Sequence, residues 1–150
     1  MANDHKNVLQ QFNDRAKTQL AGTAAMAFDG RPIDTEGLEK WYRVSFLGMA
    51  PQPVMGSSAR VEDWLWQVDC FALVDHKRTG VYKATELADT AVTAFARTNV
   101  DVLDWTEATP TTVLAKLEFL WPEVDHLPPS AAEPRLMRSV VTVHERVLDA

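Results

Sequence analysis

The chain has 150 residues, of which 46% are hydrophobic and 24% are charged, and its formal net charge at pH 7 is -6. This balance predicts one globular domain and excludes a long multidomain enzyme and an intrinsically disordered polypeptide. The excess of acidic residues argues against a dedicated nucleic-acid-binding protein, which needs a basic face to neutralise phosphates.

Cysteine content and hydropathy restrict the class of protein further. Cys70 is the only cysteine, so an internal disulfide framework is excluded and nothing indicates an oxidising compartment. No apolar run approaches the roughly 18 residues that span a bilayer, and the N-terminus lacks the basic start and apolar stretch of a signal peptide. We therefore expect a protein made in the cytoplasm that has no membrane partner.

The first forty residues predict one helix and one short strand. Apolar residues recur at spacings of three and four from Asp4 to about Leu20, which places them on one stripe of a helix that Asn3 or Asp4 can cap. Ala21–Asp29 predicts a minor strand that ends in a turn, and residues 30–39 predict a loop.

Two longer strands are predicted next. Trp41–Met49 is rich in aromatic and branched residues, and this strand is expected to stop at Ala50 because the prolines that follow cannot donate ladder hydrogen bonds. Arg60–Asp75 has apolar residues on both of its alternating faces. It therefore predicts a central strand, covered by helices on one side and by further protein on the other. One of its faces carries Trp64, Trp66, Val68, Cys70, Ala72 and Val74.

The second half of the chain predicts one helix, three strands and a long loop. The helix is expected at Thr79–Thr98, the strands at Val100–Trp105, Val113–Trp121 and Arg135–Leu148, and the loop at Pro122–Pro134. This order of elements favours an α+β fold. We expect a mainly antiparallel sheet of about four to five strands with two main helices packed on one face.

Two pairs of residues bear on catalysis. Cys70 would be a candidate nucleophile if His144 acted as its base. However, Cys70 shares a strand face with apolar residues, which favours a buried and inert thiol. Asp125 and His126 are neighbours that suggest an acid–base or ligand element. Their place in a proline-rich loop favours solvated polar residues. The sequence therefore does not predict an enzyme.

Cofactor and metal sites are also not predicted. The four histidines are far apart in sequence, and one cysteine cannot build a thiolate site. Gly56 stands alone, without the lysine of a phosphate-binding loop. The five tryptophans favour a thick aromatic core, and any that the core does not absorb are typical of a subunit interface.

Several segments form a pattern in chain order. They are an aromatic-started strand at Trp41–Ser45, a loop ending near Gly56, a strand at Trp66–Ala72, a threonine–glycine turn at Thr79 with Gly80, and an alanine-rich helix with a LAD element at Leu87–Asp89. This pattern resembles the tail terminator proteins of long-tailed bacteriophages and related tail-like particles, in which the second strand is of the FQVDVFA kind. The closing SVVTVHERV is similar to the family's valine-rich last strand.

This resemblance implies a structural virion protein at the head-proximal end of a tail. Members of the family form a ring of six that caps the tail tube, stops its polymerisation and joins it to the head-completion complex. The implied partners are further copies of the chain, the tail tube protein and a head-completion or connector protein. DNA would pass through the lumen without specific binding, which suits an acidic chain.

A closed ring requires two different complementary surfaces on each subunit, and loops between strands are natural places for them. We expect such contacts in the loops Pro51–Arg60 and Pro122–Pro134. The candidate residues for the subunit or tube interface are Gln52, Val54, Met55, Arg60, Trp64, Glu123, Asp125 and His126.

Two alternatives remain open from the sequence. A head–tail connector or tail-tube subunit belongs to the same particle, and a tube subunit would form open stacks instead of capping them. A small cytosolic enzyme or ligand-binding domain belongs to another class, because the absence of a motif does not exclude a site. A ligand that raises the melting temperature would favour this second alternative.

Overall fold

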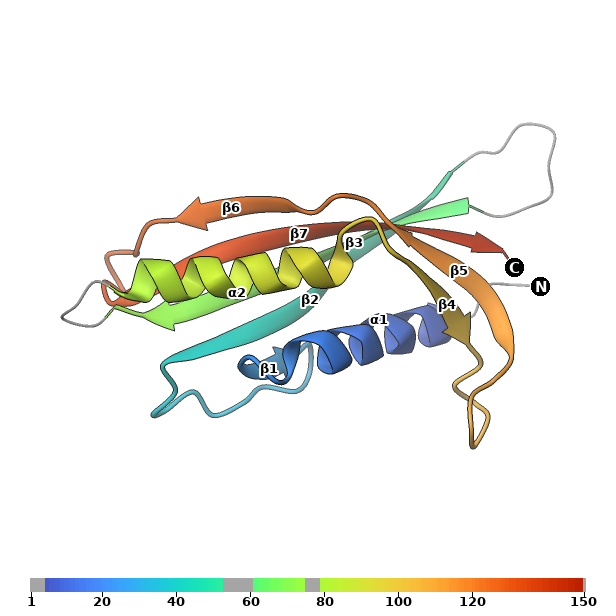
Figure 1. The fold of residues 1–150 in the computed structure, drawn as a ribbon, viewed down its shortest axis with the longest axis horizontal. Helices are drawn as coiled ribbons and strands as arrows, with labels where there is room; N and C mark the ends of the chain where they lie inside the picture. The colour runs from blue at the N-terminus through green and yellow to red at the C-terminus, as the bar shows by residue number, and fades with distance from the viewer. Residues whose placement is uncertain (1–4, 53–60, 75–78, 150) are drawn as a thin grey trace.

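A computed structural model describes residues 5–52, 61–74 and 79–149. These residues form two helices and seven strands (Figure 1). In chain order the elements are α1 (His5–Leu20), β1 (Ala25–Phe28), β2 (Lys40–Gln52), β3 (Val61–Leu73), α2 (Thr79–Phe95), β4 (Asn99–Leu103), β5 (Val113–Phe119), β6 (Glu123–Leu127) and β7 (Leu136–Asp149).

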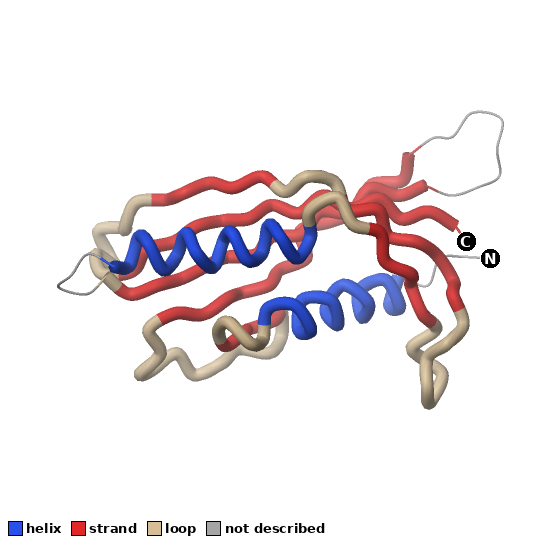
Figure 2. The backbone as a smooth tube through the Cα atoms, in the orientation of Figure 1, coloured by secondary structure: helices blue, strands red, loops and turns tan. Residues whose placement is uncertain are grey.

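The strands form one curled sheet in the order β1-β2-β3-β7-β5-β4, with β6 paired to β7 as well (Figure 2). The α+β prediction is confirmed, and so is the central position of β3 between β2 and β7. One detail of the prediction was wrong, because the described sheet has seven strands instead of four to five. The sheet is mainly antiparallel, as predicted, but it is mixed because β1 runs parallel to β2.

Both helices pack against the same face of the sheet, as predicted. Phe12 of α1 stacks on Trp66 of β3, with ring centroids 3.7 Å apart, and on Phe95 of α2, with centroids 4.9 Å apart. The Tyr42 hydroxyl of β2 donates to the Leu87 carbonyl of α2. One contiguous core therefore joins both helices to the sheet.

The opposite face of the sheet carries no helix among the described residues, although further protein was predicted over it. Arg138 of β7 lies on this face and donates to the Asp69 carboxylate of β3, with Nη2–Oδ1 at 2.8 Å. Gln67 donates to the same oxygen. Asp69 is only 1% exposed, so these hydrogen bonds compensate for the burial of its charge.

Strands β5 and β6 pair with successive parts of β7 and are separated by a one-residue bulge. Phe119 lies opposite Glu145, and Glu123 lies opposite Thr142, so three residues on one strand face two on the other. The Leu120 amide still donates to the His144 carbonyl, and strand pairing resumes at Glu123. Pro122, which has no N–H to donate, lies inside this irregular step.

Element boundaries differ from the prediction at two further points. Strand β2 continues through Pro51 to Gln52, because β1 pairs only with Trp41–Val44 and leaves that side of β2 unpaired within the described residues. Helix α2 ends at Phe95, before the predicted Thr98, and Arg97 follows with a left-handed φ of 42° that reverses the chain into β4.

Two edges of the sheet are closed by the chain itself. At β4, the buried Gln11 of α1 accepts hydrogen bonds through Oε1 from the Leu103 amide and from the Trp105 indole. Asn7, one helical turn earlier, accepts from the Trp105 amide. At β1, Phe28 exchanges two backbone hydrogen bonds with Arg31 across a tight turn.

Removing the Gln11 side chain is expected to destabilise the protein. In Gln11→Ala the Leu103 amide and the Trp105 indole both lose their acceptor, which should lower the free energy of unfolding by about 1–3 kcal/mol. Urea denaturation measures the change. Gln10→Ala, on the exposed side of the same helix, is the matched control and should change stability by less than about 0.5 kcal/mol. Equal effects of the two substitutions would contradict the assigned role of Gln11.

Candidate assembly interface

The eight candidate interface residues fall into three groups. Gln52 is the last residue of β2, and Val54, Met55 and Arg60 lie outside the described residues. Trp64 is 2% exposed and belongs to the core, where its indole donates to Glu62, so its expected place at the surface is corrected. The period-two pattern of β3 places Trp64 on the same face as Trp66, and that face lies under the helices.

Glu123, Asp125 and His126 lie together on β6. The sequence predicted a loop here, and the structure corrects it to a strand that pairs with residues 138–142 of β7. All five residues of β6 are exposed. Prolines at positions 122, 128 and 129 flank the strand, which explains why its composition predicted a loop.

The register of β6 sorts its side chains onto two faces. Val124 and His126 lie opposite Val141 and Ser139, on the side of the sheet that carries the helices. Glu123, Asp125 and Leu127 point to the opposite side. The two carboxylates are therefore neighbours on one face of an edge strand.

The outer edge of β6 is open. Within the described ranges, β6 forms backbone hydrogen bonds only with β7, and no side chain caps its other edge as Gln11 caps that of β4. A row of unpaired backbone N–H and C=O groups is a template for another strand. Figure 1 shows β6 along one margin of the sheet, away from α1.

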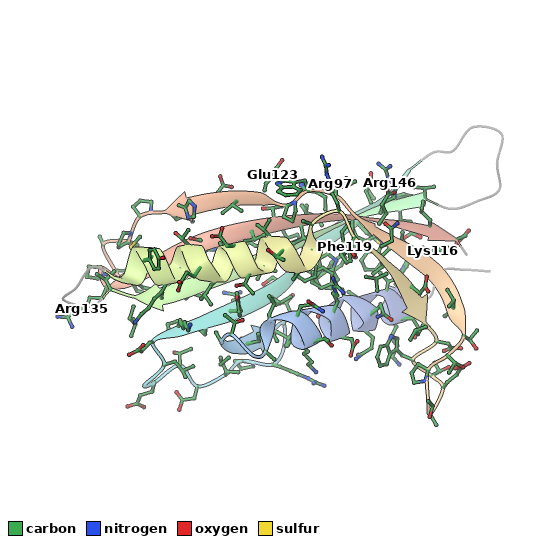
Figure 3. All side chains as sticks on the ribbon, viewed as in Figure 1. Arg97, Lys116, Phe119, Glu123, Arg135 and Arg146 are labelled. Atoms are coloured by element: carbon green, nitrogen blue, oxygen red, sulfur yellow. The ribbon has the colours of Figure 1, made fainter. Side chains whose placement is uncertain are left out.

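Sequence reasoning missed an exposed tryptophan beside this edge. A strand that continued with period two from Val113 to Trp121, as predicted, would put Trp121 on the same face as the buried Phe119, but the bulge turns the Trp121 side chain outward, where it is 61% exposed. The guanidinium of Arg97 lies 5.6 Å from the centre of its ring. Arg97 and Glu123 lie close to the bulge between β5 and β6 (Figure 3). Leu120, which precedes Trp121, is also exposed.

Cys70 and His144 cannot act together. Cys70 is fully buried on the helix side of β3, and burial raises the pKa of its thiol well above the usual range. His144 lies opposite Leu65, on the other face of the sheet. A protonated thiol without access to solvent is not a nucleophile.

The Cys70 thiol should therefore resist modification in the folded protein. Incubation with a chromogenic disulfide reagent at pH 8 is expected to leave it unmodified until the chain is unfolded in guanidinium, when one equivalent reacts. The unfolded sample is the control for reagent activity. Stoichiometric modification of the folded chain would show that the thiol is accessible.

His126 makes one contact that resembles part of a catalytic arrangement. Its Nδ1 lies 2.7 Å from the hydroxyl of Ser139, a residue that is 2% exposed and therefore out of reach of a substrate. Asp125 lies on the other face of β6 and cannot orient the imidazole. The neighbouring acid and histidine are thus not brought together as a pair.

Two carboxyl groups are buried beneath the start of α1. Glu145 accepts a hydrogen bond from the Trp66 indole at 2.7 Å, and burial raises the pKa of Glu145 to about 8. Glu62 accepts from the Trp64 indole and lies 3.2 Å from Nε2 of His5. Both are 1% exposed and lie in the core.

The rest of the described chain offers little for a ligand. No group of three or more His, Cys, Asp or Glu side chains in the described segments is placed to hold a metal ion. No described helix is both long and apolar enough to cross a membrane. An open groove of about 470 Å³ beside Trp41 and Phe71 has Asp29 in its lining, and Asp29 accepts a hydrogen bond from the Phe46 amide.

Comparisons with known proteins identify the fold. No protein-family model matches the chain, and no curated protein matches it. A solved structure, described as the virion of a native gene transfer agent particle, contains a chain with a TM-score of 0.50 and 16% sequence identity. The alignment covers 94% of this chain and 91% of that chain. At this identity the likeness shows a shared fold.

Proposed function

We propose that the chain is a structural protein of a phage-like particle and acts as a tail terminator, forming a ring that caps the tail tube and joins it to the head-completion complex. The observation that carries the proposal is the fold likeness to a chain of a gene transfer agent virion over nearly the whole length of both chains. The resemblance of Trp41–Ser45 and Trp66–Ala72 to the terminator family supports the more specific role.

The surface of the protein supports assembly more than catalysis. Trp121 is exposed beside Arg97, and both residue types are frequent at the centres of protein interfaces. Cys70 and Ser139, whose thiol and hydroxyl have nucleophilic chemistry, are both buried. An open strand edge next to an exposed tryptophan suits a protein that is completed by its neighbours.

Electron microscopy of particles assembled with and without this chain tests the proposed role. A terminator is required to stop the tube, so its deletion should give tails of uncontrolled length or tails that do not join heads. Expression of the chain from a plasmid should restore uniform, head-joined tails. Deletion that leaves tail length and head joining unchanged would reject the terminator role, whereas complete loss of tubes would indicate a tube subunit.

A further inference from the structure

We infer that the open edge of β6 takes up an extended, basic segment of a neighbouring protein as an additional antiparallel or parallel strand. That the neighbour is another virion component rests on the proposed function. The inference itself rests on the backbone edge and on the charges of residues 123–127.

The edges of the sheet differ in how they are closed. The β4 edge is capped by Gln11, and Phe28 of β1 bonds back to Arg31. The β6 edge has neither device within the described part of the chain, although all five of its residues are exposed. Exposed strand edges are usually blocked unless a partner strand completes them.

The available length of the β6 edge is short. Pro122 precedes β6 and Pro128 follows it, and proline cannot donate to a ladder. Pairing is therefore confined to Glu123–Leu127, a stretch of five residues. A short extended segment fills this edge, whereas a long strand would run past it.

The charge of the β6 edge is negative on one face. Glu123 and Asp125 lie on that face, and their cross-strand neighbours on β7 are the uncharged Thr142 and Val140. Arg138, which lies opposite Leu127 on the same face, is already bonded to Asp69. An incoming strand with lysine or arginine at alternate positions would place cations beside both carboxylates.

The same charges disfavour a second copy of β6 as the occupant. When two copies of this strand pair in parallel and in register, or antiparallel about Val124 or Asp125, a carboxylate of one copy lies opposite a carboxylate of the other. Like charges on neighbouring strands are destabilising. The edge thus selects against symmetrical self-pairing and in favour of a chemically different segment.

Peptide binding to the full chain tests the inference. The probes are a heptapeptide in which lysine and valine alternate and one in which glutamate replaces lysine, and the readout is the amide NMR signals of residues 123–127 at low ionic strength. The basic peptide should shift these signals and bind at least about tenfold more tightly than the acidic one. N-methylation of alternate peptide amides should abolish binding, because it removes the ladder hydrogen bonds.

A charge-reversed protein makes the test specific. The double substitution Glu123→Lys with Asp125→Lys should reverse the preference, so that the acidic peptide binds more tightly. Glu86→Lys with Asp89→Lys, on the exposed side of α2, is the matched control and should keep the wild-type preference. Unchanged melting temperatures verify that both variants fold.

Three results would overturn the inference: no binding of either peptide, equal affinities for both peptides, or shifts confined to residues outside β6. None of these results bears on tail length or head joining in the deletion experiment. A terminator whose β6 edge binds no basic segment would keep its proposed function and lose only this contact.

Discussion

Replacing Phe12 by alanine is expected to lower the free energy of unfolding by about 3–5 kcal/mol. The Phe12 side chain is fully buried and stacks on Trp66 of β3 and Phe95 of α2. Its removal leaves a cavity at the point where both helices meet the sheet. Urea denaturation followed by tryptophan fluorescence measures the loss.

Phe12→Leu serves as the volume control. It retains an apolar side chain at this point and should cost roughly 1–2 kcal/mol. Ala16, also buried on α1, lies one turn further along and provides no ring to this stack. A Phe12→Ala variant that loses less than about 1 kcal/mol would show that α1 contributes little to the core.

The second large effect is expected for Glu145→Gln, which should change how the free energy of unfolding depends on pH. The pKa of this carboxyl is raised by burial from its ordinary 4.5 to about 8, so the folded chain holds the proton that the unfolded chain releases. Its contribution to stability is full below pH 4.5 and is lost as the pH rises towards 8. The total loss is of the order of 4 kcal/mol.

Glutamine imitates the protonated carboxyl and does not titrate. It keeps an oxygen for the Trp66 indole, so Glu145→Gln should match the wild type near pH 4.5 and exceed its stability increasingly up to pH 8. Glu123→Gln, on the exposed β6, is the control and should follow the wild-type curve. If the free energy of unfolding depended on pH in the same way for Glu145→Gln and the wild type, the prediction would be contradicted. Such a result would mean that folding does not raise the pKa of the Glu145 carboxyl.

Much of the fold follows from periodicity in the sequence. The alternation of β3 placed Trp64 and Cys70 on one face, which the structure buries, and the helix predicted at Thr79–Thr98 forms as α2, with Leu87 and Phe95 buried. These patterns are strong because an apolar side chain has one favourable side. The buried Glu145 also had a signal, since it continues the alternation of Val143 and Val147.

The features that the sequence did not predict are those that depend on strand register or on the residues that flank a strand. The flanking prolines hid β6 as a strand, because proline marks both loops and the ends of edge strands. The position of Trp121 depends on the bulge at residues 120–122, which only pairing with β7 defines. The caps by Asn7 and Gln11 join residues more than 90 positions apart.

The candidate site was predictable only in part. Glu123, Asp125 and His126 were singled out from a proline-rich segment and lie at the exposed β6 edge. Trp64 was singled out for its residue type and lies in the core. Aromatic residues serve both cores and interfaces, so residue type alone does not separate the two.

Immunogold electron microscopy of purified particles that carry a peptide tag at the C-terminus of this chain tests the proposed role most directly. A terminator ring predicts one gold cluster on each tail, at the junction with the head. Gold distributed along the tube, or particles that contain no tagged chain, would contradict it.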